Sequence, residues 1–305
     1  MSHVAAKTAV DFDSTDTLKE GIVWLASYPK SGNTWFRIFL KNLMARHEDP
    51  AKLQGIGCSI ASARSVFDDL AGIDSSEMSH DEIDWYRAQV YEQIASEARS
   101  FPIFMKTHDA YTYLASGEPM LSRKATAGGI YFVRNPLDVA VSFAYHSGHN
   151  NFDRTITEMG SRECGHFCHG NKRLFMQLRQ LMFGWSGHVE SWTQSDAKVH
   201  VMRYEDMKAN PQETFSGAIQ FTGLDYNEED VTIALEKSKF ENLQQMEQED
   251  GFREKAVQCT AFFRKGSVGS WREKLNEQQV ERIITDHGKL MKQFGYLDEN
   301  NQPVF

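Results

Sequence analysis

The 305-residue sequence has no long apolar run, few cysteines and no Pro/Gly/Ser-rich linker. Its longest apolar runs, 22–25 and 130–133, are far shorter than the roughly 20 residues of a membrane span, so we expect no such span. Four cysteines are too few for a disulfide scaffold in this chain and favour a reducing, cytoplasmic location. Residues 1–20 lack the basic start and apolar core of a signal peptide and are predicted to form a flexible leader. With neither linker nor internal repeat, the remainder, 21–305, is predicted to be a single domain.

The sequence also lacks an excess of positive charge. It has 33 Lys and Arg against 42 Asp and Glu, which gives a formal net charge of −9. This balance disfavours nucleic acid or anionic lipid as a partner. The charge is unevenly distributed, because residues 225–250 hold nine acidic and two basic side chains, whereas residues 253–274 hold six basic and two acidic ones. The basic stretch leaves room for a local site that binds a small anion.

A repeated strand-then-helix pattern predicts the fold class. Four short runs rich in β-branched and aromatic residues have the composition of buried strands: 22–28, 102–106, 129–134 and 198–204. Helical patterns follow three of these runs, at 34–46, 136–146 and 211–221. The last two begin with Pro after a capping Asn. The pattern predicts an α/β protein with a parallel sheet, whose ligand binds at the carboxyl ends of the strands.

The first strand runs into a segment suited to binding phosphate. Residues 27–35 read S-Y-P-K-S-G-N-T-W, a strand end, a tight turn and a helix start. Backbone N–H groups at a helix N-terminus bind anions, and Lys30, Ser31 and Thr34 add a charge and two hydroxyls, while Gly32 allows close approach. The Walker pattern G-x-x-x-x-G-K-S/T is not met, because Lys30 precedes the single Gly. The alternative is an ordinary strand-to-helix turn.

Three further segments carry groups that suit anion binding or proton transfer. Residues 134–142 read R-N-P-L-D-V-A-V-S, in which Arg134 ends a predicted strand and Ser142 lies on the next helix. Residues 262–272 read F-F-R-K-G-S-V-G-S-W-R, a basic loop that can fold over a phosphate or simply be solvated. Residues 106–108 read K-T-H after an apolar strand, and a His with a pKa near about 6.5 suits a general base.

Taken together and in this order, these segments resemble the motifs of sulfotransferases that use 3′-phosphoadenosine 5′-phosphosulfate (PAPS). The first is similar to T-Y-P-K-S-G-T-T-W, with Ser27 and Asn33 as departures. The second resembles R-N/D-P-x-D-x-x-x-S, and the third R-K-G-x-x-G-D-W-K/R, with Ser270 in place of Asp. The resemblance implies a P-loop-like central parallel β-sheet flanked by helices in three α/β/α layers. It also implies PAPS as co-substrate and PAP as product, with no metal.

The resemblance assigns roles to individual residues. His108 is the expected base, Lys106 an electrostatic stabiliser, and Lys30 the group that holds the bridging oxygen. The expected nucleotide-binding residues are Lys30, Ser31, Gly32, Asn33, Thr34, Trp35, Arg134, Ser142, Tyr204, Ser238, Phe240, Arg264, Lys265 and Gly266. Three of them, Tyr204, Ser238 and Phe240, rest on weaker matches and have an equally good structural interpretation. Tyr204 could be a core residue at the end of a strand, Ser238 a helix cap and Phe240 a core aromatic.

The acceptor and the oligomeric state are not fixed by these motifs. The expected acceptor is a small molecule, glycan, lipid or peptide that carries a hydroxyl or an amine, bound by loops near 52–80, 109–125 and 145–175. The family's dimer motif, K-x-x-x-T-V-x-x-x-E, is absent, because Lys255 is followed by A-V-Q-C-T. Two rival functions stay open: a P-loop nucleotide kinase and a non-catalytic PAP-binding module. Cys164 and Cys168, with their neighbouring histidines, lack a second ligand pair and do not indicate a zinc site.

Overall fold

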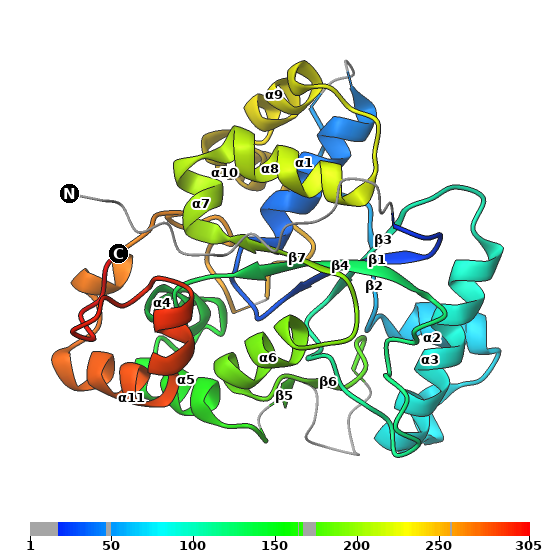
Figure 1. Ribbon diagram of the computed structural model, residues 1–305, viewed down its shortest axis with the longest axis horizontal. Coiled ribbons are helices and arrows are strands. Elements are labelled where there is room, and N and C mark those ends of the chain that lie inside the picture. The colour runs from blue at the N-terminus through cyan, green and yellow to red at the C-terminus, as the bar shows by residue number, and fades with distance from the viewer. Residues whose placement is uncertain (1–17, 47–49, 164, 167–174, 257) are drawn as a thin grey trace.

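The computed structural model describes residues 18–46, 50–163, 165–166, 175–256 and 258–305. Their centre is a five-stranded parallel sheet in the order β2-β3-β1-β4-β7 (Figure 1). Its strands are β1 (Ile22–Ser27), β2 (Ser59–Ile60), β3 (Ile103–Thr107), β4 (Thr126–Val133) and β7 (Val199–Arg203). A separate antiparallel pair joins β5 (Gly165–His166) to β6 (Gln180–Leu181). The α/β fold with a parallel sheet is as predicted. Seventeen of the twenty predicted leader residues, 1–17, lie outside the described residues.

Both faces of the sheet are buried, because side chains of one strand alternate between two cores. Val23 and Leu25 of β1 pack in one apolar cluster, whereas Trp24 and Ala26 pack in the other. The first cluster includes aromatic side chains of the helices on its face, such as Phe36 and Phe215. A strand with both faces covered needs an uninterrupted apolar sequence, which explains the pattern of β1.

Helices cover the sheet in two layers (Figure 1). On one face lie α1 (Asn33–Ala45), α7 (Tyr204–Ala209), α8 (Pro211–Thr222), α9 (Glu228–Lys237) and α10 (Phe240–Asp250). On the other lie α4 (Pro136–His146), α5 (Phe152–Gly160), α6 (Gly184–Thr193) and α11 (Glu277–Gln293). The remaining helices are α2 (Arg64–Ala71), α3 (His80–Glu97) and the 3-10 turns η1 (Ser75–Glu77) and η2 (Ser270–Glu273). No helix within the described ranges is both long and apolar enough to cross a membrane.

The strand register brings the predicted site segments to one edge of the sheet. Lys106 of β3 lies beside Leu25 of β1, and Ser27 at the end of β1 lies beside Phe132 of β4. The chain leaves the carboxyl ends of β1, β3, β4 and β7 just before Lys30, His108, Arg134 and Tyr204. All four predicted strands and the three predicted helices are present, within a few residues at each end. The parallel arrangement therefore gathers residues that lie far apart in the sequence.

Candidate active site

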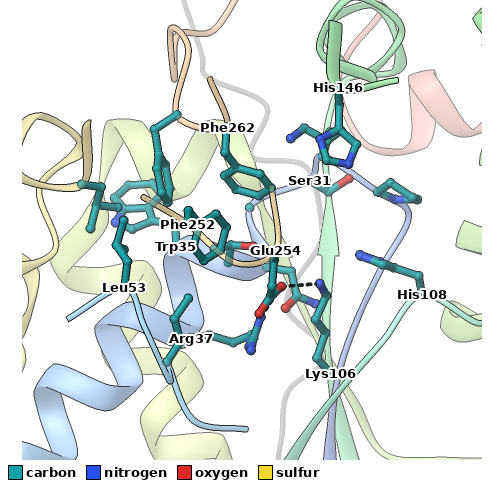
Figure 2. Close-up of a pocket in the computed structure, with 18 of the residues that line it drawn as sticks. Ser31, Trp35, Arg37, Leu53, Lys106, His108, His146, Phe252, Glu254 and Phe262 are labelled. Carbon is teal, nitrogen blue, oxygen red and sulfur yellow. Dashed lines mark hydrogen bonds and ion pairs between the residues drawn. The ribbon is translucent and has the colours of Figure 1, made fainter. Parts of the chain in front are cut away.

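A cavity of about 860 Å³ opens at the carboxyl edge of the sheet (Figure 2). Every predicted catalytic or nucleotide-binding residue lines it, except Ser238. The Ser238 hydroxyl is fully buried beneath the cavity wall, where it donates to Ala234 O and accepts from Asn42 Nδ2. Its carbonyl oxygen accepts a hydrogen bond from Trp35 Nε1 at 2.9 Å. Ser238 thus ends α9, and its carbonyl orients the Trp35 side chain, which lines the cavity.

The turn between β1 and α1 forms the floor of the cavity. Gly32 has φ 106°, and a Cβ there would lie 3.0 Å from the Tyr204 ring, so both the turn and the close approach require glycine. Asn33 Nδ2 donates to Leu25 O at 2.7 Å and ties the turn to its strand. Ser31 Oγ is buried, and no hydrogen-bond partner for it exists among the described residues. An unpartnered hydroxyl beside the first N–H groups of α1 suits the oxygens of a phosphate.

Lys30 and Arg134 bring positive charge to this floor. Burial lowers the pKa of Lys30 to about 7, and the nearby Arg134 and Lys106 add to this effect. The Lys30 ammonium lies 3.9 Å from the centroid of the Phe262 ring. Arg134 donates to Lys30 O at 3.1 Å, while its Nε is buried without a partner within the described ranges. A bound anion would satisfy that Nε and favour the protonated Lys30.

The basic stretch folds over the floor and is fastened by Asp138. This carboxylate is fully buried and accepts from Gly269 N at 2.7 Å, from Ser270 Oγ at 3.0 Å and from Trp271 N at 3.1 Å. Ser270, which departs from the family motif, is thus one of its partners. The structure therefore explains the Asp in the second motif: it joins that motif to the third.

Two aromatic side chains flank the same loop at Gly266. Gly266 has φ 59°, and a Cβ there would overlap the Phe240 ring. Tyr204 Oη donates to Gly266 O at 3.0 Å, and the Arg134 guanidinium lies 4.1 Å from the Tyr204 ring. Trp35 packs edge-on to Tyr204, with 6.2 Å between their centroids. These contacts bring Trp35, Tyr204 and Phe240 together around one part of the cavity.

His108 is held by its backbone and by one ring nitrogen. Its Nδ1 donates to Ser27 O at 2.7 Å, so the neutral ring carries its lone pair on Nε2. His188 Nε2 donates to His108 O at 3.1 Å, while His188 Nδ1 accepts from Tyr131 Oη at 2.9 Å. Burial lowers the pKa of His188 to about 4, which keeps that ring neutral. The arrangement fixes the tautomer of His108 that can accept a proton.

Lys106 pairs with an acid that the sequence analysis did not select. Lys106 Nζ donates to Glu254 Oε2 at 2.9 Å, and Arg37 Nη1 donates to the two Glu254 oxygens at 2.7 and 2.9 Å. Figure 2 shows Glu254 reaching down from the loop between Arg37 and Lys106. Its only signal in the sequence is that it is one of two acids in the basic stretch. Nothing in the sequence pairs it with Arg37, a residue 217 positions away.

The remaining wall is largely apolar and includes Leu53, Ile56, Ile60, Met176, Phe252 and Phe262. The predicted acceptor loop at 52–80 contributes to this wall, and the described part of 145–175 contributes His146. No residue of the third predicted loop, 109–125, lines the cavity. That segment is instead held against α6, where Trp192 Nε1 donates to Asp109 O at 3.0 Å. Cys164, Cys168 and His169 lie outside the described residues.

Comparison with known proteins gives a consistent family. The sequence profile described as "Sulfotransferase domain" matches residues 20–295. An amine sulfotransferase of Oryctolagus cuniculus is 25% identical over 288 residues, which cover 91% of this chain and 83% of that protein. A flavonol 4′-sulfotransferase of Flaveria chlorifolia is 23% identical over 275 residues, covering 86% and 76%. The crystal structure of a mouse sulfotransferase complexed with PAP has a TM-score of 0.55, 20% identity and coverage of 92% and 87%.

Proposed function

Because this chain belongs to the sulfotransferase domain family, we propose that it transfers the sulfuryl group of PAPS to a hydroxyl or amine of an acceptor. The observation that carries the proposal is the placement of His108, with its lone pair on Nε2, on the same cavity as two unpartnered buried donors, Ser31 Oγ of the β1–α1 turn and Arg134 Nε. A site built this way can hold a phosphosulfate and remove a proton from a nucleophile beside it.

The nucleotide would occupy the motif-bearing part of the cavity. Lys30, Ser31, Gly32 and Thr34 would hold the 5′-phosphosulfate, because they surround the N-terminus of α1. The 3′-phosphate would bind Arg134, Ser142, Arg264, Lys265 and Gly266, and the adenine would pack among Trp35, Tyr204 and Phe240. The PAP complex of the mouse sulfotransferase supports this choice of nucleotide.

The chemistry would be an in-line displacement at sulfur. His108 Nε2 takes the proton of the acceptor hydroxyl or amine as the new bond to sulfur forms. The bond between sulfur and the bridging oxygen breaks, and PAP leaves with its electron pair. Lys30 offsets the charge that develops on the leaving phosphate, and Lys106 offsets the charge on the sulfuryl oxygens. The Ser27 carbonyl keeps His108 in the tautomer that accepts the proton, and His188 holds the backbone of His108 in place.

The relatives support an acceptor with a hydroxyl or an amine. The two named above act, by their names, on a flavonol and on an amine. In this chain the apolar wall formed by Ile56, Ile60 and Phe252 favours an acceptor with an apolar body. An amine acceptor would have to be deprotonated before attack, which His108 can assist.

Transfer of labelled sulfate from PAPS tests the proposal. The purified chain is incubated with sulfur-labelled PAPS and a pool of phenols, alcohols and apolar amines, and labelled products are separated. We expect transfer by the wild type and a decrease of at least about 100-fold in His108→Gln. His80→Ala, which removes a His of α3 that does not line the cavity, is the matched control. Equal transfer by His108→Gln and wild type would contradict the assignment of the base.

A further inference from the structure

Glu254 is the one carboxylate among the described side chains that line the cavity, whereas eight Lys and Arg side chains line it. An acid is unexpected in a site for a polyanionic nucleotide, because like charges repel. Yet Glu254 is mostly buried and is not free to turn away, since Lys106 and Arg37 bind both of its oxygens. Its side chain is only 20% exposed. The presence of an acid here is therefore best explained by what it does to Lys106 and Arg37.

We propose that Glu254 is a positioning residue for sulfuryl transfer: clamped by Arg37, it holds the Lys106 ammonium protonated and in place on the cavity wall. The inference rests on the proposed function, in which Lys106 offsets charge on the sulfuryl oxygens. An ammonium has three donors, so Lys106 can keep its bond to Glu254 and still donate to a sulfuryl oxygen.

Lys106 needs such a partner because its surroundings favour loss of the proton. Burial lowers the pKa of Lys106, and the neighbouring Arg37 lowers it further, whereas Glu254 raises it. The charged or titratable groups around it come from several elements: Glu254 from the loop, Arg37 from α1, Lys30 from the β1–α1 turn, His108 after β3 and Cys58 before β2. Burial raises the pKa of the Cys58 thiol, so Glu254 is the anion of this group at neutral pH.

Glu254 is itself well placed to stay ionised. Burial alone would raise its pKa, but Lys106 and Arg37 together lower the pKa of Glu254 to about 2. Arg37 is rigid as well as charged, because its side chain is 3% exposed and Nη2 donates to Gly57 O at 3.1 Å. Nη1 of this fixed guanidinium lies within hydrogen-bond distance of both Glu254 oxygens and so sets the direction of the carboxylate. Lys106 is thereby oriented by the α1 helix through Glu254.

The loop that carries Glu254 also links the Arg37–Glu254–Lys106 cluster, called the clamp below, to the proposed nucleotide site. Glu254 lies between α10 and the R-K-G run at 264–266, which is proposed to hold the 3′-phosphate. The loop is seated by Phe252, which packs on Phe262 with centroids 4.8 Å apart, and by Glu247, which accepts from Phe262 N at 2.7 Å. One segment therefore brings both the phosphate ligands and Glu254 to the cavity.

Competitive acetylation of the full chain tests the clamp without an acceptor. The rate at which acetic anhydride modifies Lys106 is measured by mass spectrometry from neutral to alkaline pH. We expect Glu254→Gln to lower the pH of half-maximal reaction at Lys106 by about one to two units. Glu249→Gln, which removes an exposed acid of α10, should leave it unchanged. An unchanged Lys106 titration in Glu254→Gln overturns the proposal, whatever becomes of the proposed reaction.

Turnover provides the second arm once an acceptor is identified. We expect Glu254→Gln to lower kcat by about tenfold and to move the alkaline limb of its pH profile to lower pH, with PAP affinity within about threefold of wild type. Glu254→Asp, a shorter acid, should recover part of both effects and serves as the variant if Glu254→Gln fails to fold. A rise in kcat in Glu254→Gln would overturn the proposal, because Glu254 would then compete with the sulfuryl group for Lys106.

Discussion

The two halves of the cavity are built in different ways. The half proposed to bind the nucleotide is made of short motifs. Lys30 and Arg134 follow the carboxyl ends of β1 and β4, and the 264–266 run lies in the loop between α10 and η2. The other half is lined by apolar side chains such as Ile60 and by the Arg37–Glu254 pair, which no motif contains. Phosphate demands particular donors in a particular geometry, whereas an apolar acceptor demands only shape and area. Motifs therefore reveal the nucleotide half and say little about the acceptor half.

Among substitutions in the two halves, the largest loss of stability and of PAP affinity is expected at Asp138, which joins two motifs of the proposed nucleotide half. Asp138→Ala removes three hydrogen bonds to the 269–271 segment from a buried site. We expect the free energy of unfolding to fall by about 3 kcal/mol, measured by urea denaturation. PAP affinity should fall with it, because the phosphate loop loses its attachment. Asp81→Ala, at an exposed ion pair of α3, should change stability by less than about 0.5 kcal/mol. Equal effects of the two substitutions would contradict the role of Asp138.

A smaller effect concerns the pH dependence of PAP binding. Lys30 has a lowered pKa of about 7 in the free protein, and a bound 5′-phosphate should raise it. Above pH 7 binding must then take up a proton, so PAP affinity should fall by up to about tenfold per pH unit. Calorimetry in buffers of different ionisation enthalpy measures this uptake. Lys30→Met should bind more weakly and lose the uptake, and an unchanged uptake in that variant would assign it to another group.

The smallest effect is expected in the acceptor half. Ile60→Ala trims one half-buried side chain of the apolar wall, so the acceptor KM should rise by about fivefold. PAP affinity should not change, because Ile60 lies outside the motif-bearing half. Ile73→Ala, a partly exposed residue that does not line the cavity, is the control for steady-state kinetics. A change in PAP affinity in Ile60→Ala would show that the two halves are not separate.

Much of the fold followed from local pattern. The buried strands were predicted because parallel strands need continuous apolar runs, and the helix starts at Pro136 and Pro211 were predicted from Pro after Asn. Asn135 caps its helix by accepting from Leu137 N, whereas the side chain of Asn210 makes no capping hydrogen bond. The three predicted helices are α1, α4 and α8. The two-residue β2 and several other helices were not predicted, among them α2, which is short, and α3, whose amphipathic pattern is weak. The single domain over 21–305 and the cytoplasmic location stay predictions.

Sequence reasoning misses residues whose role depends on contacts between distant segments. Ser238 matched a nucleotide-binding position and equally a helix cap, and it ends α9 beneath the wall, where α1 packs on α9. His188 was missed because nothing local to its helix indicates a bond to the backbone of His108, 80 residues earlier. Glu254 was missed for the same reason. Local sequence encodes the ligand-binding donors, and tertiary contacts select the residues that position them.

Calorimetric titration with PAP and with 5′-AMP, which lacks the 3′-phosphate, tests the central claim most directly. If Arg134 and the 264–266 loop form a 3′-phosphate site, PAP should bind at least about 100-fold more tightly than AMP, since each lost charge-assisted hydrogen bond costs about 1.5–3 kcal/mol. Arg134→Ala should remove most of that difference. Equal affinity of the wild type for PAP and AMP would contradict the account.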